Sequence, residues 1–332
     1  MAEPLTPEWY DQVDEKVLDP DQAIIDPHHH LWPPGGTLPY GPDELHADVA
    51  SGHRVEHTVF MECGAAYRPD GPAHLRSVGE TEFVTRVARS DPRGLIAAMI
   101  VHSDLSDTSH LAEALDTHAE SSGGLVRGIR DALASEPHRE GLRIPGTAPA
   151  GKSRDPAFRE GVAVLGRRAL VYESWHYHHQ NRDFAELARS VPDTLMVLDH
   201  FGTPLGVGVY EGHRDEIFAQ WKIDITEIAA CDNVVAKIGG MAMPDNGFGW
   251  HRGARPPTSD EFVAAQRAYY EHTIESFGPQ RCMFESNFPI DRFSLSYRVL
   301  WNALKKIAAP YSESERHDMF YGTASRVYKL TL

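Results

Sequence analysis

The sequence is poor in cysteine and contains no long hydrophobic run. Only Cys63, Cys231 and Cys282 occur among its 332 residues. An odd number of widely spaced cysteines in apolar surroundings predicts reduced core thiols and not a disulfide framework. No apolar run approaches the roughly 20 residues of a membrane-spanning helix, and residues 1–20 have neither the basic nor the apolar region of a secretory signal. We therefore expect a cytoplasmic protein without a membrane partner.

Basic residues are also scarce relative to acidic ones. The 32 lysines and arginines face 48 aspartates and glutamates, which gives a formal net charge of −16. This balance disfavours nucleic acid and anionic membranes as partners. It remains compatible with a local basic pocket, so we expect a small anionic molecule as the substrate.

No linker-like stretch divides the chain after residues 1–22, which we interpret as an N-terminal arm. Residues 23–332 alternate between strand-like and helix-like segments, and the strand-like segments are nearly continuous apolar runs typical of a covered parallel sheet. This pattern predicts an α/β fold, a single-domain (β/α)8 TIM-type barrel. Its strands are expected near residues 24–30, 57–63, 95–102, 124–131, 169–175, 195–200, 233–238 and 281–287.

A doubly wound open sheet is the alternative fold. It is disfavoured because no glycine-rich phosphate-binding fingerprint follows the first strand. Barrels of the predicted kind often pair, so a homodimer is possible.

The first predicted strand ends in an unusual stretch, Asp26-Pro27-His28-His29-His30, before the breaker Pro33-Pro34-Gly35-Gly36. Side chains alternate between the faces of a strand. Asp26, His28 and His30 are therefore expected on one face and His29 on the other. A carboxylate and two imidazoles at a strand exit indicate a metal site or an acid–base site.

Polar residues also gather at the ends of the other predicted strands. Active sites of (β/α)8 barrels lie at the carboxyl ends of the strands, so these side chains are predicted to converge. They are Glu62, Arg127, Arg130, Trp175, Tyr177, His178, Gln180, Asp199, His200, Lys237, Glu285 and Asn287.

Three segments resemble the amidohydrolase superfamily, and most closely its amidohydrolase-related (amidohydrolase 2) family. They are Ile25-Asp26-Pro27-His28-His29-His30-Leu31-Trp32, Leu198-Asp199-His200-Phe201-Gly202-Thr203-Pro204 and Met283-Phe284-Glu285-Ser286-Asn287-Phe288-Pro289. Their order and spacing match from about residue 23 onward. The family includes sugar lactonases and hydrolases similar to pyrone-dicarboxylate lactonase, so the resemblance implies a hydrolase.

The resemblance also implies roles for individual residues. His28 and His30 correspond to the pair that binds a divalent metal, with Asp26 in support, and His200 to a metal ligand or carbonyl polariser. The implied cofactor is one divalent ion, Zn²⁺ or Mn²⁺, held mainly by imidazole. A binuclear site is not expected, because the predicted fourth strand has no lysine to bridge two ions.

The sequence departs from the family pattern at Asn287, where an aspartate normally takes the proton of the attacking water. An amide cannot act as a general base near neutral pH. Either a neighbour such as Glu285, Asp199 or His178 takes over this role, or the reaction needs no base there. The candidate catalytic residues are therefore His200, Asn287, His178 and Glu285.

Candidate substrate-binding residues follow from charge and position. Arg127 and Arg130 are three residues apart on a strand and face opposite sides, and Arg130 is the preferred ligand for a substrate carboxylate. Trp175, Tyr177 and Gln180 follow the fifth strand, and Trp250 lies in an aromatic loop after the seventh.

Three readings of function remain open at this stage. The first is hydrolysis of a small carboxylated or polyhydroxylated lactone, with His200 polarising the carbonyl. The second is a lyase, a decarboxylase or hydratase, acting on an aromatic or muconate-like acid. The third is a catalytically lapsed barrel that serves as a binding protein, which Asn287 favours and the histidine set opposes.

Overall fold

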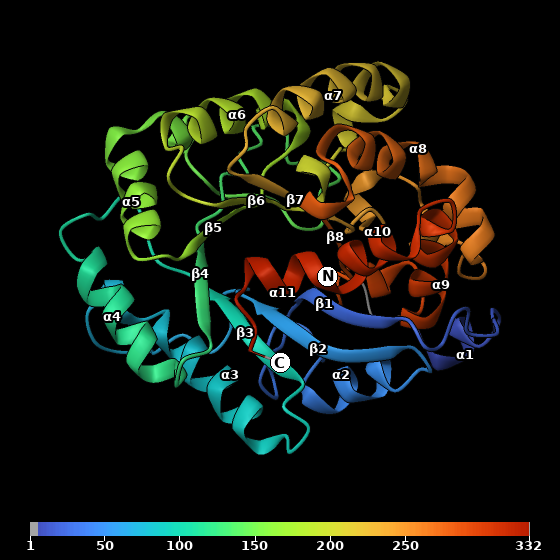
Figure 1. Ribbon diagram of the computed structural model, residues 1–332, viewed down its shortest axis with the longest axis horizontal. Helices are drawn as coiled ribbons and strands as arrows, with labels where there is room; N and C mark the ends of the chain where they lie inside the picture. Colours follow the sequence, from blue (N-terminus) through green and yellow to red (C-terminus); the bar gives the residue numbers. More distant parts are fainter. Residues whose placement is uncertain (1–5, 332) are drawn as a thin grey trace.

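The computed structural model describes residues 6–331 and confirms the predicted barrel (Figure 1). Eight parallel strands pair in the order β1-β2-β3-β4-β5-β6-β7-β8. An isolated parallel bridge between His29 and Phe288 joins the first strand to the segment after the last, which closes the ring. The strands are β1 (Ala23–His29), β2 (Arg54–Met61), β3 (Ile96–Val101), β4 (Val126–Arg130), β5 (Val171–Ser174), β6 (Met196–Leu198), β7 (Val234–Ile238) and β8 (Cys282–Phe284).

Helices surround the strands, as Figure 1 shows. Several begin where the sequence has a capping signal: Asp155 accepts from the backbone of Ala157 ahead of Pro156, and Thr258 and Glu261 form a capping box. The α-helices are α1 (Pro7–Tyr10), α2 (Pro42–Val49), α3 (Val78–Ser90), α4 (Leu111–Ser122), α5 (Pro156–Arg167), α6 (Asn181–Ser190), α7 (Arg214–Ala229), α8 (Ser259–Phe277), α9 (Tyr297–Ala308), α10 (Glu313–His317) and α11 (Thr323–Val327).

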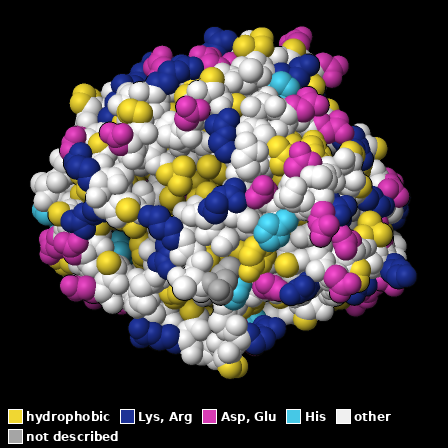
Figure 2. Space-filling model, in the orientation of Figure 1, with side chains coloured by type: hydrophobic (Ala, Val, Ile, Leu, Met, Phe, Trp, Pro, Cys, Tyr) yellow, Lys and Arg dark blue, Asp and Glu magenta, His cyan; other side chains and the backbone are white. Residues whose placement is uncertain are grey.

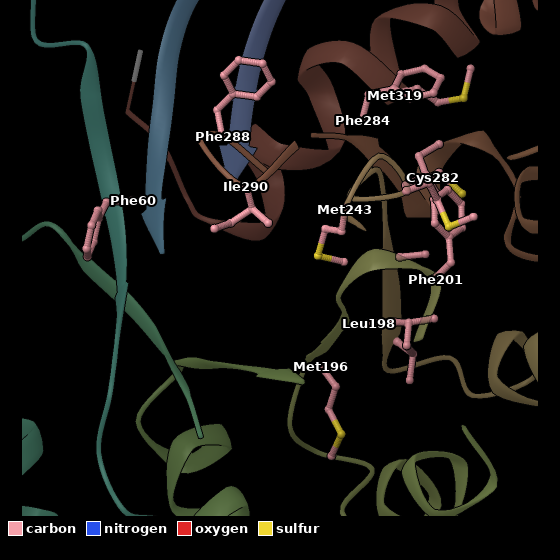
Figure 3. Close-up of a cluster of buried hydrophobic side chains, with 14 of the residues drawn as sticks. Phe60, Met196, Leu198, Phe201, Met243, Cys282, Phe284, Phe288, Ile290 and Met319 are labelled. Atoms are coloured by element: carbon pink, nitrogen blue, oxygen red, sulfur yellow. The ribbon is translucent and has the colours of Figure 1, made fainter. Parts of the chain in front are cut away.

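The strands have apolar side chains on both faces, which explains their continuous hydrophobic runs. One cluster fills the barrel, and a larger one lies between barrel and helices. Figure 3 shows part of the larger cluster, including Phe60, Leu198 and Phe284. The interior cluster includes Ala324 and Val327 of α11 together with Tyr328, and α11 crosses the barrel in Figure 1. The last helix therefore closes the end of the barrel at which the strands begin.

The described part of the N-terminal arm, residues 6–22, lies against the last helices, and residues 1–5 are outside the described range. Glu15 accepts hydrogen bonds from Ser259 and Asn302, and the Lys305 ammonium donates to the carbonyls of Leu18 and Asp19. These contacts fasten the arm to α8 and α9.

The structure bears on the predictions about cysteines and about membrane-spanning helices. All three cysteines are free, and Cys231 and Cys282 are buried. Among residues 6–331, no helix is both long and apolar enough to cross a membrane. On the face in Figure 2, acidic and basic side chains are interspersed.

Candidate active site

A cavity of about 840 Å³ opens at the carboxyl ends of the strands. Its walls come from the ends of β1, β2, β3 and β4 and from the loops after β4, β5, β6, β7 and β8. Met243 and Ile290 border it, and both side chains are labelled in Figure 3. Six predicted site residues line it, namely His30, Glu62, Arg130, Trp175, His200 and Asn287.

The prediction that Asp26 shares a face with His28 and His30 is wrong. Between Asp26 and His29 the register of β1 against β2 shifts, because three steps along β1 match two along β2. Such a bulge inserts one residue and reverses the alternation. Asp26 accepts hydrogen bonds from the Tyr297 hydroxyl of α9 and the Ser286 backbone. Its carboxylate therefore joins β1 to the outer layer, and burial raises its pKa to about 6.

His28 and His200 converge on one carboxylate, that of Glu285. Nδ1 of His200 is 2.7 Å from Oε1 of Glu285, and Nδ1 of His28 is 2.9 Å from Oε2. The centroids of the two imidazole rings are 4.5 Å apart. All three side chains are buried. Glu285, which stands directly before the Ser286-Asn287 pair, is thus the centre of the histidine cluster.

The Gly239-Gly240 pair after β7 makes room for this cluster. A Cβ atom at Gly239 would lie 2.4 Å from Cγ of Glu285, and one at Gly240 would lie 2.2 Å from Nδ1 of His200. Gly240 also has a positive φ of 71°, which favours glycine. Larger residues at these positions would displace the two side chains that hold the site together.

Next to His28, a group of buried charged side chains lies inside the barrel. Nζ of Lys237 lies 2.6 Å from Glu173 and 3.7 Å from Asp199, and 3.4 Å from Nδ1 of His28. The Tyr328 hydroxyl donates to Glu173. Burial raises the pKa of Glu173 to about 8 although Lys237 opposes this. Burial disfavours ionised Asp199, but Lys237 and Arg130 outweigh it and lower its pKa.

The two arginines of β4 have separate positions, as their spacing predicts. Arg130 faces the interior, where Nε donates to Glu62 at 2.7 Å and Nη1 lies 3.3 Å from Asp199. The Arg127 side chain donates instead to the carbonyl of Tyr328 at the opposite end of the barrel. Arg127 does not reach the cavity, so its predicted role in substrate binding is wrong, and the reason is the alternation along the strand.

The buried charges of this centre are out of balance. The centre holds two basic side chains, Arg130 and Lys237, and four carboxyl groups, so carboxyl groups outnumber basic groups, although the pKa of about 8 for Glu173 favours one bound proton. Three of the carboxyl groups, those of Glu173, Asp199 and Glu285, are buried, and that of Glu62 is 14% exposed. A divalent cation, or protons such as the one on Glu173, would balance the excess, because unpaired buried charge is costly.

The donor atoms fit a divalent ion. His28, His200 and Glu285 each offer one ligand atom, and these atoms lie within 4.8 Å of one another. Two imidazoles and a carboxylate are a donor set typical of catalytic zinc. A second such group among the described residues, His28 with Glu173 and Asp199, already surrounds the Lys237 ammonium and suits a cation less well.

His30 lies beside this donor group, but its ring is held by a backbone carbonyl and not by Glu285. Its Nδ1 is 2.9 Å from the carbonyl of Met61, which accepts a hydrogen bond, so Nε2 is the nitrogen left for the cavity. Burial and the nearby charge of Arg130 hold the pKa of His30 well below its usual range. His30 is therefore neutral at physiological pH, with a lone pair directed away from the backbone.

Asn287 is fixed by a buried carboxylate four residues later. Its Nδ2 donates to Oδ1 of Asp291 at 2.9 Å, and Oδ2 of Asp291 accepts from the backbone of Ala242. Burial raises the pKa of Asp291 to about 7. With Nδ2 engaged, the amide oxygen of Asn287 is the group that faces the cavity.

Of the predicted cluster after β5, only Trp175 contacts the cavity. The Tyr177 hydroxyl bonds the backbone of Gly146 and Ile144, and the Gln180 amide bonds Leu133 and Ser135. Both side chains hold the loop between β4 and α5 in place. Their predicted substrate contacts are wrong, because this long loop covers them.

His178 and Trp250 are also outside the cavity wall. Nδ1 of His178 accepts from the backbone of Leu205, and its ring packs on Tyr210. Trp250 stacks between Phe248 and Phe262. The structure therefore corrects both predictions, since each ring is used for loop packing.

Sequence reasoning missed several residues of the site. Lys152 and Asp131 form an ion pair in the cavity wall, and Tyr328 and Asp291 orient other polar side chains. Asp291 had one available signal, because it lies one helical turn after Asn287. No local sequence pattern indicates Lys152, Asp131 or Tyr328.

A (β/α)8 barrel with a histidine and carboxylate centre at its strand ends defines an amidohydrolase-type enzyme. Comparison with known proteins agrees. The family model described as Amidohydrolase matches residues 25–330. The chain therefore belongs to this family and is a hydrolase.

The chain is also similar to individual proteins. The uncharacterized protein y4mH of Sinorhizobium fredii is 31% identical, over 93% of this chain and 99% of that protein. L-fucono-1,5-lactonase of Burkholderia multivorans is 30% identical, over 76% of this chain and 77% of that enzyme. A zinc-bound amidohydrolase structure from Burkholderia multivorans is 26% identical, with a TM-score of 0.72 over 93% of this chain and 99% of that one.

Proposed function

We propose that the protein hydrolyses a lactone, and that the lactone is uncharged and polyhydroxylated. The observation that carries this proposal is the neutral imidazole of His30 beside the His28, His200 and Glu285 group in one cavity. An acyl-transfer site needs a base for water and an electrophile for the carbonyl. The similarity to L-fucono-1,5-lactonase supports the lactone as substrate.

We further propose one divalent ion, zinc or manganese, held by His28, His200 and Glu285. When bound, it supplies a Lewis acid that polarises the lactone carbonyl and lowers the pKa of water. The family commonly uses such an ion, and a similar amidohydrolase structure contains zinc.

The protein's own residues move the protons. Nε2 of His30 takes a proton from water as the water oxygen bonds to the carbonyl carbon. The Asn287 amide oxygen accepts the other water proton in a hydrogen bond and so orients the water. The Arg130 guanidinium stabilises the negative charge that develops on the carbonyl oxygen. When the ring C–O bond breaks, the proton on His30 passes to the leaving alkoxide.

The charge of the cavity wall favours an uncharged lactone over a carboxylated one. Both cations of the wall are already paired, Arg130 with Glu62 and Lys152 with Asp131. Asp104 and Asp155 add further negative charge. An anionic substrate remains a prediction from the sequence. Among the described wall residues, no unpaired lysine or arginine supports it.

The test is a screen of sugar lactones, dicarboxylated lactones and aromatic acids, read by proton release and by CO2. We expect proton release with the sugar lactones. CO2 from an aromatic acid would establish the lyase reading instead, and no turnover at all would favour a binding protein.

The role of His30 is separable from that of the metal ligands. His30→Gln should lower kcat by about 10²–10⁴ and retain the metal, whereas His200→Gln should lose the metal. Elemental analysis of both purified variants measures this. Metal loss from His30→Gln would show that His30 is a ligand and not the base.

A further inference from the structure

The cavity is larger on one side than the proposed reaction needs. Its volume of about 840 Å³ lies near the upper end of the roughly 300–1,000 Å³ of sites that bury drug-sized ligands, whereas a monosaccharide lactone has only about a dozen non-hydrogen atoms. The reacting groups come from the ends of β1 and β4, the loop after β6 and the segment after β8. Most of the remaining wall comes from the loops after β2, β3 and β4.

A loop held by several hydrogen bonds forms the wall on that side. The loop from 131 to 155 is tied down at several points. Leu133 and Ala134 donate backbone hydrogen bonds to the Trp175 carbonyl, and both oxygens of Asp245 accept from the loop backbone, at 2.8 Å from Arg143 and 3.1 Å from Ile144. The Tyr177 and Gln180 contacts add to these. A loop held this firmly presents a preformed surface.

This surface carries aromatic rings and a paired acidic and basic side chain. Tyr67 is 37% exposed, and its ring stacks on His102 with an interplanar angle of 19° and a centroid distance of 6.4 Å. Lys152 and Asp131 form an ion pair whose side chains are only 14% and 4% exposed but border the cavity. Asp131 also accepts from the backbone of Leu105, so the pair is held in position. An ion pair offers donors and acceptors side by side without net charge, which suits vicinal hydroxyls.

We infer that the cavity has a second subsite, formed by Tyr67, His102, Asp131 and Lys152, that binds an uncharged sugar ring attached to the reacting lactone. An aromatic face suits the apolar face of a sugar ring, and the paired charges suit its hydroxyl groups. A charged substituent would meet no unpaired cation in this part of the wall. The inference rests on the proposed lactonase function for its catalytic test and predicts that lactones of disaccharide acids are preferred over monosaccharide lactones.

The catalytic test compares glucono-1,5-lactone with cellobiono- and lactobiono-1,5-lactone. We expect kcat/KM to be at least tenfold higher for the disaccharide lactones. Tyr67→Ala and Lys152→Met should each lower kcat/KM for the disaccharide lactones at least tenfold more than for the monosaccharide lactone. Lys222→Met, an exposed lysine on α7, is the matched control and should change neither value.

A binding test does not depend on turnover. Trp32 and Trp175 line the cavity, so their fluorescence can report binding of lactitol and sorbitol, which cannot be hydrolysed as lactones. Lactitol should bind at least tenfold more tightly than sorbitol, and Tyr67→Ala should remove the difference while circular dichroism shows a folded protein. If no lactone reacts but lactitol binds tightly, the result contradicts the proposed lactonase function and not the subsite.

Two results would overturn the subsite. One is equal kcat/KM for both lactone classes together with equal binding of lactitol and sorbitol. The other is a stronger preference for alkyl- or aryl-substituted lactones of similar size, which would mean an apolar subsite.

Discussion

At the scale of single residues, the exchange of a strand-eight aspartate for Asn287 is compensated by its neighbours. The Asn287 amide pairs with the buried carboxylate of Asp291, and Glu285 joins His28 to His200. Carboxyl groups therefore remain at this strand end, two residues before Asn287 at Glu285 and four residues after it at Asp291. The departure does not leave the site without acid–base groups.

Asn287→Asp should lower activity and not restore it. The new carboxylate would face Asp291 across the 2.9 Å now spanned by a hydrogen bond, and two like charges so close cannot both ionise. We expect kcat/KM to fall at least tenfold and the free energy of unfolding to fall by about 1–3 kcal/mol. Lactone hydrolysis and urea unfolding measure the two effects.

The control is the exchange variant Asn287→Asp/Asp291→Asn, which restores one amide and one carboxylate. Its free energy of unfolding should recover toward that of the wild type. A gain of activity in Asn287→Asp alone would instead show that the native site lacks a base.

At the scale of elements, the loops after the strands decide the shape of the site. The β1 bulge directs His28 inward and Asp26 outward. The loop after β4 covers the polar residues that follow β5. Residues 175–180 are a conspicuously polar stretch of the sequence. In the structure they mainly support the loop between β4 and α5.

Asp245→Ala should loosen the cavity wall without touching the reacting groups. The carboxylate accepts from two consecutive backbone amides, of Arg143 and Ile144, and both would lose a buried partner. We expect KM for the lactone to rise about tenfold, corresponding to about 1.4 kcal/mol, with a smaller change in kcat. Limited proteolysis should cut within residues 136–150.

Asp193→Ala, at an exposed position, is the control for this variant. Unchanged KM and unchanged proteolysis in Asp245→Ala would contradict the idea that Asp245 holds the wall.

Lys305 makes the docking of the N-terminal arm sensitive to pH. Burial lowers its pKa from 10.5 to about 8, so between these values the unfolded chain binds more protons than the folded one. Stability from this group is therefore lowest below pH 8 and rises as the pH approaches 10.5. Relative to Lys305→Met, the wild type should gain on the order of 2 kcal/mol across this range.

Urea unfolding of both proteins at several pH values measures that difference. Lys306→Met is the control, because this neighbouring ammonium pairs with Asp260 at the surface. A pH-independent difference between wild type and Lys305→Met would disprove the assignment.

At the scale of the whole molecule, the buried charges couple metal binding to folding. The excess carboxyl groups of this centre destabilise the folded chain unless a cation or protons balance their charge. An ion that binds only the folded state adds about 4 kcal/mol at a thousandfold excess over its dissociation constant. Removing it with a chelator should therefore lower Tm and abolish lactone hydrolysis, and zinc or manganese should restore both.

Calorimetry with elemental analysis checks this prediction. His28→Gln should have a low Tm that does not respond to the chelator. An unchanged Tm after complete metal removal from the wild type would mean that protons balance the charges. The possible homodimer stays a prediction, which sedimentation equilibrium can test.

The sequence by itself determined the barrel, because eight apolar runs separated by amphipathic segments allow few other folds. It also indicated His28, His30, His200, Glu285 and Asn287, since the carboxyl ends of all strands meet at one rim. It could not determine the outward turn of Asp26, because one inserted residue reverses the alternation of a strand. Tertiary structure alone paired Arg130 with Glu62, brought Asp291 to Asn287 and placed Tyr177 and Gln180 under a loop. Those contacts join residues whose positions depend on how separate loops pack, which no local pattern encodes.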